Sequence, residues 1–169
     1  AAIQTLLDPE NCGPVTLSLP QDVQAEAFDY PEDFFVKRTH SIRKIKIDDA
    51  ELARAVETLK NLKKPLIIVG GGVHYADACI ALQEFAKKYQ IPVAETSAGK
   101  GALAWNHPTY IGAIGVTGSN AANNMAKQAD IVLAIGTRLN DFTSGSRALF
   151  SDKTILQLNV ARFDAIKHN

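Results

Sequence analysis

The chain of 169 residues lacks several features that would point to a class of function. Its two cysteines, Cys12 and Cys79, lie far apart and form no metal or redox motif, which predicts two buried thiols in a cytoplasmic protein. Lys and Arg number 18, as do Asp and Glu, so the basic excess of a nucleic-acid binder is missing. No apolar run approaches the roughly 20 residues that span a bilayer, and no secretory leader is visible. We therefore expect neither a nucleic-acid partner nor a membrane partner.

Familiar catalytic and metal-binding motifs are also missing. The sequence contains no G-x-S-x-G, H-E-x-x-H, C-x-x-C or G-x-x-x-x-G-K-[ST] pattern. Its four histidines do not have the spacing of metal ligands. No nucleophile and base can be paired from sequence neighbours. We therefore assign no catalytic residue and no metal ligand.

The most informative stretch is an apolar run at 65–69 that ends in Gly70, Gly71 and Gly72. Such a run without alternation is typical of a strand buried on both faces of a parallel sheet. A helix to about Tyr89 follows it. Glycines at this point permit a sharp turn and a close approach to a neighbour or ligand. The spacing is not G-x-G-x-x-G, so a nucleotide crevice and a simple tight turn both stay open.

Strand and helix patterns alternate along the rest of the chain. This order predicts an α/β fold, a three-layer Rossmann-like parallel sheet with helices on both faces. The expected elements are a strand at 14–19, a helix opened by Asp48 as N-cap, strands at 65–69, 91–95, 130–136 and 154–160, a helix opened by Ser119 as N-cap that runs to about Gln128, and loops over much of 96–118.

The carboxyl ends of parallel strands share one edge of the sheet, so the loops at 70–72, 96–101, 136–145 and 159–162 should converge there. Lys100 offers a cation to an anionic group or is an exposed loop lysine. Arg138 clamps a phosphate or pairs with Asp141. His74 meets a ligand or has a structural role. The candidate nucleotide-binding residues are Gly70, Gly71, Gly72, Gly99, Lys100, Gly136, Thr137, Arg138 and Asn159.

Five segments, in this order and spacing, resemble the central domain of thiamin-diphosphate-dependent enzymes of the acetolactate synthase and pyruvate oxidase group. They lie at 64–73, 91–96, 99–101, 107–108 and 129–138. The resemblance implies three parts. Residues 1–19 would end a pyrimidine-binding domain, 20–47 would be a linker, and 48–169 would form the central domain. It also implies one further strand beyond Asn169, so the chain is expected to be a piece of a longer polypeptide.

Within this group, the segment 12–35 looks most like the trihydroxycyclohexane-dione hydrolase subfamily of myo-inositol breakdown. That resemblance implies hydrolysis of a carbon–carbon bond between adjacent carbonyls of a ketonic substrate. It also implies packing against the remaining domains and assembly into a homodimer or homotetramer. Two alternatives remain: a fragment of an acetolactate synthase-like carboligase or decarboxylase, and a free-standing FAD- or ADP-binding module.

The resemblance also bears on cofactors. It implies thiamin diphosphate and magnesium bound outside this chain, because the Gly-Asp-Gly motif that holds them does not occur here. FAD-binding relatives carry an Arg-Phe-Asp-Asp-Arg-type loop where this chain has Arg138-Leu139-Asn140-Asp141-Phe142. Relatives that grip an adenosine ribose carry an acid where Asn159 stands. These departures argue against FAD and weaken the case for ADP.

Overall fold

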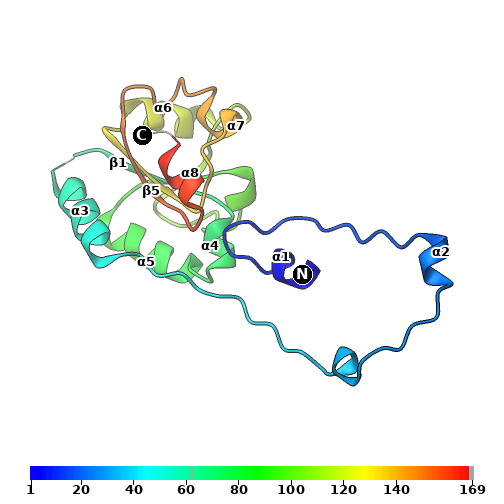
Figure 1. Cartoon of the computed structure of the whole chain (residues 1–169). Coiled ribbons are helices and arrows are strands. Elements are labelled where there is room, and N and C mark those ends of the chain that lie inside the picture. The colour runs from blue at the N-terminus through cyan, green and yellow to red at the C-terminus, as the bar shows by residue number, and fades with distance from the viewer. Residues whose placement is uncertain (62, 168–169) are drawn as a thin grey trace. The chain divides into compact units, whose positions relative to one another are not determined.

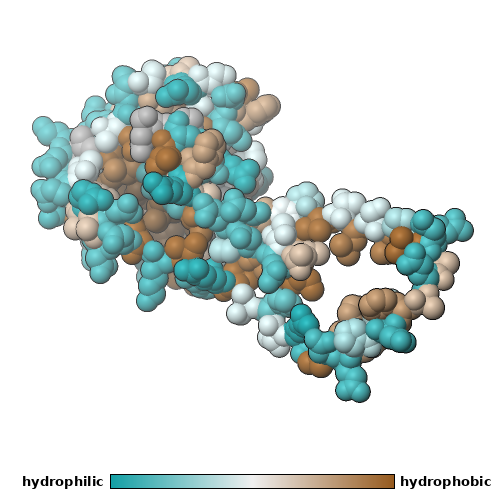
Figure 2. Space-filling view, viewed as in Figure 1, coloured by the Kyte–Doolittle hydropathy of each residue, from teal (hydrophilic) through white to brown (hydrophobic). Residues whose placement is uncertain are grey.

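The computed structural model describes residues 1–61 and 63–167 and divides the chain into two units, Ala1–Ile45 and Lys46–Asn169. The first unit contains the short helices α1 (Ala2–Leu6) and α2 (Gln21–Gln24) and the 3-10 turn η1 (Glu32–Phe35). Many of its apolar side chains face solvent, as the brown atoms along this part of Figure 2 show. Among them, Leu17 and Phe35 are each 72% exposed.

The strand expected at 14–19 does not form, and that prediction is wrong. A strand needs a neighbour to accept and donate its backbone hydrogen bonds. The described part of the first unit has no sheet that could supply one. Cys12 is exposed and Cys79 is partly buried, so the prediction of two buried thiols is also wrong. The wider assignment of residues 1–19 and 20–47 to a preceding domain and a linker stays a prediction.

The second unit is built on a five-stranded parallel sheet in the order β3-β2-β1-β4-β5. The central strand β1 pairs with β4 in register from Pro65↔Ile131 to Val69↔Ile135. The predicted α/β class and parallel sheet are therefore confirmed. The strands are β1 (Pro65–Val69), β2 (Val93–Glu95), β3 (Tyr110–Ala113), β4 (Ile131–Ile135) and β5 (Thr154–Leu158).

Helices lie on both faces of this sheet (Figure 1). Leu66 and Ile68 of β1 pack towards Ala122 and Ala126 of α6, whereas the alternate residues of β1 pack towards α4 and α5. The period of two along a strand divides the core in this way. The helices are α3 (Asp49–Lys60), α4 (Gly72–Tyr75), α5 (Cys79–Tyr89), α6 (Asn120–Gln128), α7 (Asp141–Ser144) and α8 (Arg162–Ile166), with the 3-10 turn η2 (Ser97–Gly99).

Both predicted N-caps are confirmed. The Asp48 carboxylate accepts hydrogen bonds from the backbone N–H groups of Ala50 at 3.0 Å and Glu51 at 3.1 Å. The Ser119 hydroxyl accepts one from the N–H of Ala122. Each side chain satisfies donors that the first turn of a helix leaves without an intrahelical partner. Within the described residues, no helix is long and apolar enough to cross a membrane.

Two local predictions need correction. The helix expected between the glycines and Tyr89 is interrupted, because Asp77 adopts the left-handed conformation with φ 55° and separates α4 from α5. The loop-rich region contains the strand β3, which pairs with β2 with an irregular register. Gly112, with φ 98°, lies inside β3, and a glycine at this position makes the segment resemble a turn in the sequence. Both departures depend on single residues in left-handed backbone.

We predict that Gly70→Ala destabilises the second unit by about 1–3 kcal/mol in urea unfolding. A Cβ at Gly70 would lie 2.6 Å from the Cβ of Thr137 and would overlap the carbonyl oxygen of Gly136. Gly71→Ala is the matched control, since its nearest neighbour is the Ala98 side chain at 3.3 Å. Equal destabilisation by the two substitutions would contradict this account of the turn.

Candidate functional site

The loops that follow β1, β2 and β4 meet at the carboxyl edge of the sheet. Gly70 donates its N–H to the carbonyl of Ile135 at 2.9 Å, and Gly72 donates to that of Gly136 at 3.0 Å. The imidazole Nε2 of His74 lies 3.4 Å from the carbonyl oxygen of Gly99. The parallel topology thus brings candidate residues from separate loops into direct contact.

These glycines allow the backbones of neighbouring loops to pack in direct contact. A Cβ on Gly72 would lie 2.6 Å from the Cα of Gly136, and one on Gly99 would overlap the carbonyl oxygen of Val69. The space that a side chain would occupy is therefore filled by a neighbouring loop of the same chain. At Gly70, Gly72, Gly99 and Gly136 the geometry fits loop packing.

The two candidate cations differ in their surroundings. Lys100 is exposed, and within the described residues its ammonium group has no ion-pair partner. Arg138 lies 3.3 Å from the carboxylate of Asp164, which also receives a hydrogen bond from Lys167 at 2.8 Å. The alternative that Arg138 pairs with Asp141 is therefore wrong. Its guanidinium ties the loop after β4 to α8.

Asn159 uses its side-chain amide to connect two loops. Its Nδ2 donates to the backbone carbonyl of Thr137 at 3.0 Å, and its Oδ1 accepts from the N–H of Ala161 at 3.0 Å. A ribose hydroxyl would compete with these bonds. Asn159, Arg138 and the glycines thus all have partners within the chain. The assignment of a nucleotide role to these residues stays a prediction.

Glu95 is a buried charged residue that the sequence analysis did not single out. It ends β2, is only 3% exposed, and accepts hydrogen bonds through Oε1 from the N–H groups of Gly101 at 3.2 Å and Leu103 at 3.0 Å. Burial raises the pKa of Tyr110, and the charge of Glu95 and a hydrogen bond to it raise that pKa further. The sequence did contain a feature that could have pointed to Glu95. It is a carboxylate at the end of an apolar strand, followed a few residues later by a Gly-Lys-Gly turn. Glu95 holds the turn that carries Lys100.

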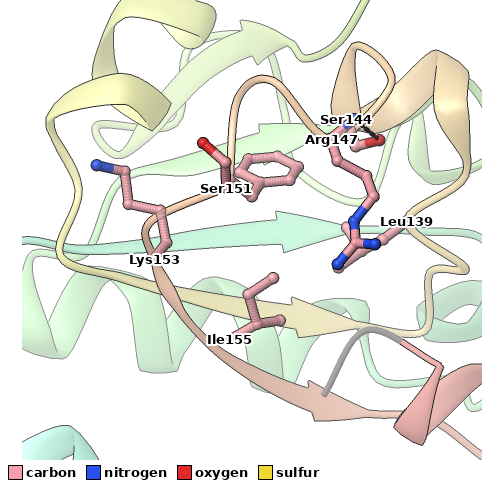
Figure 3. Close-up of a pocket in the computed structure, with 7 residues that line it drawn as sticks. Leu139, Ser144, Arg147, Ser151, Lys153 and Ile155 are labelled. Atoms are coloured by element: carbon pink, nitrogen blue, oxygen red, sulfur yellow. Dashed lines mark hydrogen bonds between the residues drawn. The ribbon is translucent and has the colours of Figure 1, made fainter.

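A small hollow of about 90 Å³ is lined by residues between 139 and 155 (Figure 3). Leu139, Phe150 and Ile155 supply apolar walls, and Ser144, Ser151, Arg147 and Lys153 supply polar ones. The Lys153 ammonium lies 3.1 Å from the carboxylate of Asp152, whose pKa is lowered by that contact. None of the nine candidate residues lines this hollow. No group of three potential metal-ligating His, Cys, Asp or Glu side chains occurs in the described part of the chain.

The described residues thus form a Rossmann-like parallel sheet whose edge loops pack against one another. The profile of the family described as "Thiamine pyrophosphate enzyme, central domain" matches residues 52–169. The chain belongs to this family. The resemblance drawn from the sequence segments is thereby confirmed.

More specific relatives carry the name 3D-(3,5/4)-trihydroxycyclohexane-1,2-dione hydrolase. The protein of that name from Geobacillus thermodenitrificans is 49% identical over 166 residues, which cover 98% of this chain and 26% of the relative. The Clostridium tetani protein is 48% identical and the Bacillus thuringiensis protein 49% identical, each over 168 residues with the same coverage. The chain therefore spans about a quarter of the length of these relatives.

We predict that Glu95→Ala destabilises the second unit by about 2–4 kcal/mol, because it leaves the N–H groups of Gly101 and Leu103 without their acceptor. Glu84→Ala, at an exposed position on α5, is the control. Urea unfolding measures both. A loss no larger than that of the control would show that Glu95 does not hold the turn.

The same carboxylate affects the titration of Tyr110. Glu95→Gln should lower the Tyr110 pKa towards its ordinary value near 10, because one of the causes of its rise is removed. A pKa raised in the folded state stabilises the fold fully below about 10, and this contribution is lost as pH rises through the folded value. Ultraviolet titration of the phenol, compared with Tyr110→Phe, measures the shift. An unchanged pKa in Glu95→Gln would contradict the coupling.

Asn159→Asp should destabilise the second unit by about 1–3 kcal/mol, since a carboxylate oxygen would then face the Thr137 carbonyl in place of a donor. Asn124→Asp on α6, at an exposed position, controls for the added charge. Calorimetry with ADP provides the second measurement, and we expect no gain in binding. If Asn159→Asp bound ADP without loss of stability, Asn159 would be a ligand-binding position rather than a tie between loops.

Proposed function

We propose that this chain is the central, structural portion of a thiamin-diphosphate-dependent hydrolase that opens the ring of a trihydroxycyclohexane-dione in myo-inositol breakdown. The observation that supports this most strongly is the 49% identity to hydrolases of that name, which extends over 98% of the chain. Identity at this level includes the first unit as well as the sheet. The proposal includes a cytoplasmic location, which is supported by the exposed free thiol of Cys12.

The proposed role of the chain is to hold other domains in place. Thiamin diphosphate, with magnesium, would supply a carbanion that attacks a carbonyl of the substrate, and both would be bound outside this chain. Here, Glu95 fixes the turn after β2, Asn159 fixes the loop after β4, and Asp164 ties α8 to that loop. The loops after β2, β4 and β5 thus each take part in side-chain contacts at one edge of the sheet. A fixed edge of this kind suits a spacer between catalytic domains.

The exposed apolar side chains of the first unit support contact with further protein. Phe28, Tyr30, Phe34 and Phe35 form a cluster of ring contacts with centroids 5.0–6.1 Å apart, yet each of these rings is at least 57% exposed. Aromatic clusters of this kind are common at interfaces. We propose that the remaining domains of the same enzyme, or a second subunit of a homodimer or homotetramer, cover them.

Expression of the whole reading frame that contains this chain tests the function. We expect ring opening of the trihydroxycyclohexane-dione that depends on added thiamin diphosphate and magnesium, and no turnover by the 169-residue chain alone. Pyruvate is the control substrate, because a carboligase or decarboxylase would consume it. Consumption of pyruvate with no ring opening would overturn the proposed substrate.

Calorimetric titration of the 169-residue chain tests its role as a spacer. We expect no binding of thiamin diphosphate with magnesium, and weak or no binding of FAD and ADP, because the glycine contacts are filled and the Asn159 amide is engaged. ADP or FAD binding at micromolar affinity, about −8 kcal/mol, would make the edge a working nucleotide site. Tight binding of thiamin diphosphate would contradict the assignment to the central domain.

A further inference from the structure

Beside the glycine contacts, a thiol faces an imidazole. His74 lies in α4 and Cys79 is the first residue of α5, the two helices that follow β1 (Figure 1). The Sγ atom of Cys79 lies 3.4 Å from Nδ1 of His74. This is within the reach of a hydrogen bond to sulfur, so a nucleophile and a base are neighbours here.

The other nitrogen of the ring determines which role Nδ1 plays. Nε2 of His74 lies 3.4 Å from the carbonyl oxygen of Gly99, and a carbonyl can only accept a hydrogen bond. We assign the hydrogen of the neutral ring to Nε2, where it can be donated to Gly99, and this tautomer leaves the lone pair of Nδ1 free. That lone pair points at the thiol of Cys79, which donates its S–H. The Gly99 carbonyl thus orients the His74 ring so that Nδ1 faces the Cys79 thiol.

Two further features favour a reactive sulfur. Cys79 is partly exposed, so a small reagent can reach it. It also begins an 11-residue helix, whose first N–H groups favour negative charge nearby. Cys12, in contrast, is exposed and has no imidazole partner among the described residues. The chain therefore contains its own comparison thiol.

We propose that Cys79 is a site of covalent modification, a thiol whose sulfur attacks hydroperoxides and other soft electrophiles selectively because His74 accepts its proton. With a hydroperoxide, Sγ attacks the near oxygen, an S–O bond forms and the O–O bond breaks. The sulfur loses two electrons to become a sulfenic acid, and the peroxide is reduced to water or an alcohol. The thiol proton passes to Nδ1 of His74 and from there to the leaving oxygen. No further reactant is needed.

Iodoacetamide alkylation of the intact chain tests the reactivity, with both cysteines followed in the same sample by peptide mass spectrometry. The S–C bond forms, iodide leaves, and the proton goes to His74. At pH 7 we expect Cys79 to react at least about tenfold faster than Cys12, a modest gain for an adjacent base. Equal rates, or a faster Cys12, would overturn the proposal.

The pH dependence separates base assistance from mere accessibility. Near pH 10, an ordinary thiol with a pKa of about 8.5 is ionised without help. The advantage of Cys79 over Cys12 should therefore shrink towards a constant set by access alone. An advantage that is undiminished at pH 10 would mean that exposure, not His74, makes Cys79 reactive, and the proposal would fail.

His74→Asn provides the matched variant. Its amide oxygen keeps a hydrogen-bond acceptor near the position of Nδ1 but cannot take the proton. We expect the Cys79 rate at pH 7 to fall to within about threefold of that of Cys12, while the unfolding midpoint shows that the fold is intact. In wild type, hydrogen peroxide followed by dimedone should label Cys79 before Cys12. Labelling that is unaffected by His74→Asn would overturn the role of His74.

Discussion

The close approach of the β1 and β4 turns is the constraint on which the carboxyl edge of this sheet depends. Gly70 and Gly72 meet Gly136 with no room for a Cβ, and two backbone hydrogen bonds cross the contact. Parallel strands expose their terminal N–H and C=O groups at this edge, and these groups need partners. In this domain the neighbouring loop supplies them. Here the chain satisfies these groups with its own backbone.

The remaining ties at the edge follow from that contact. Once the β4 turn is fixed against β1, Asn159 can reach the Thr137 carbonyl from β5, and Arg138 can reach Asp164 on α8. Glu95 holds the turn after β2, where its Oε1 atom accepts hydrogen bonds from the N–H groups of Gly101 and Leu103. The Asn159 and Arg138 ties connect loops that follow different strands, whereas Glu95 holds the loop that follows its own strand. Together these contacts hold several loops at one edge of the sheet.

Much of this fold could be predicted from the sequence because its strands are apolar runs that end in glycine or a polar residue. The runs at 65–69 and 130–136 gave the two central strands, and Asp48 and Ser119 marked helix starts. The sequence analysis missed β3 because Gly112 interrupts its apolar pattern. It missed the break at Asp77 because a single residue in left-handed backbone does not change the hydrophobic periodicity of the sequence around it. The segment 14–19 alternates like a strand, but pairing depends on a neighbour, which local sequence does not encode.

The candidate site shows a similar limit. Topology places 70–72, 96–101, 136–145 and 159–162 at one edge, and this much follows from the order of strands. Whether glycines at such an edge cradle a phosphate or pack against a loop depends on a few tenths of an ångström. The spacing of glycines in the sequence does not predict that distance. The types of side chain around the edge are partly informative. The amide of Asn159 can both donate to a carbonyl and accept from an N–H, whereas an ionised acid can only accept. The amide of Asn159 can therefore join the Thr137 carbonyl to the N–H of Ala161, a pair of contacts that a carboxylate at this position could not make.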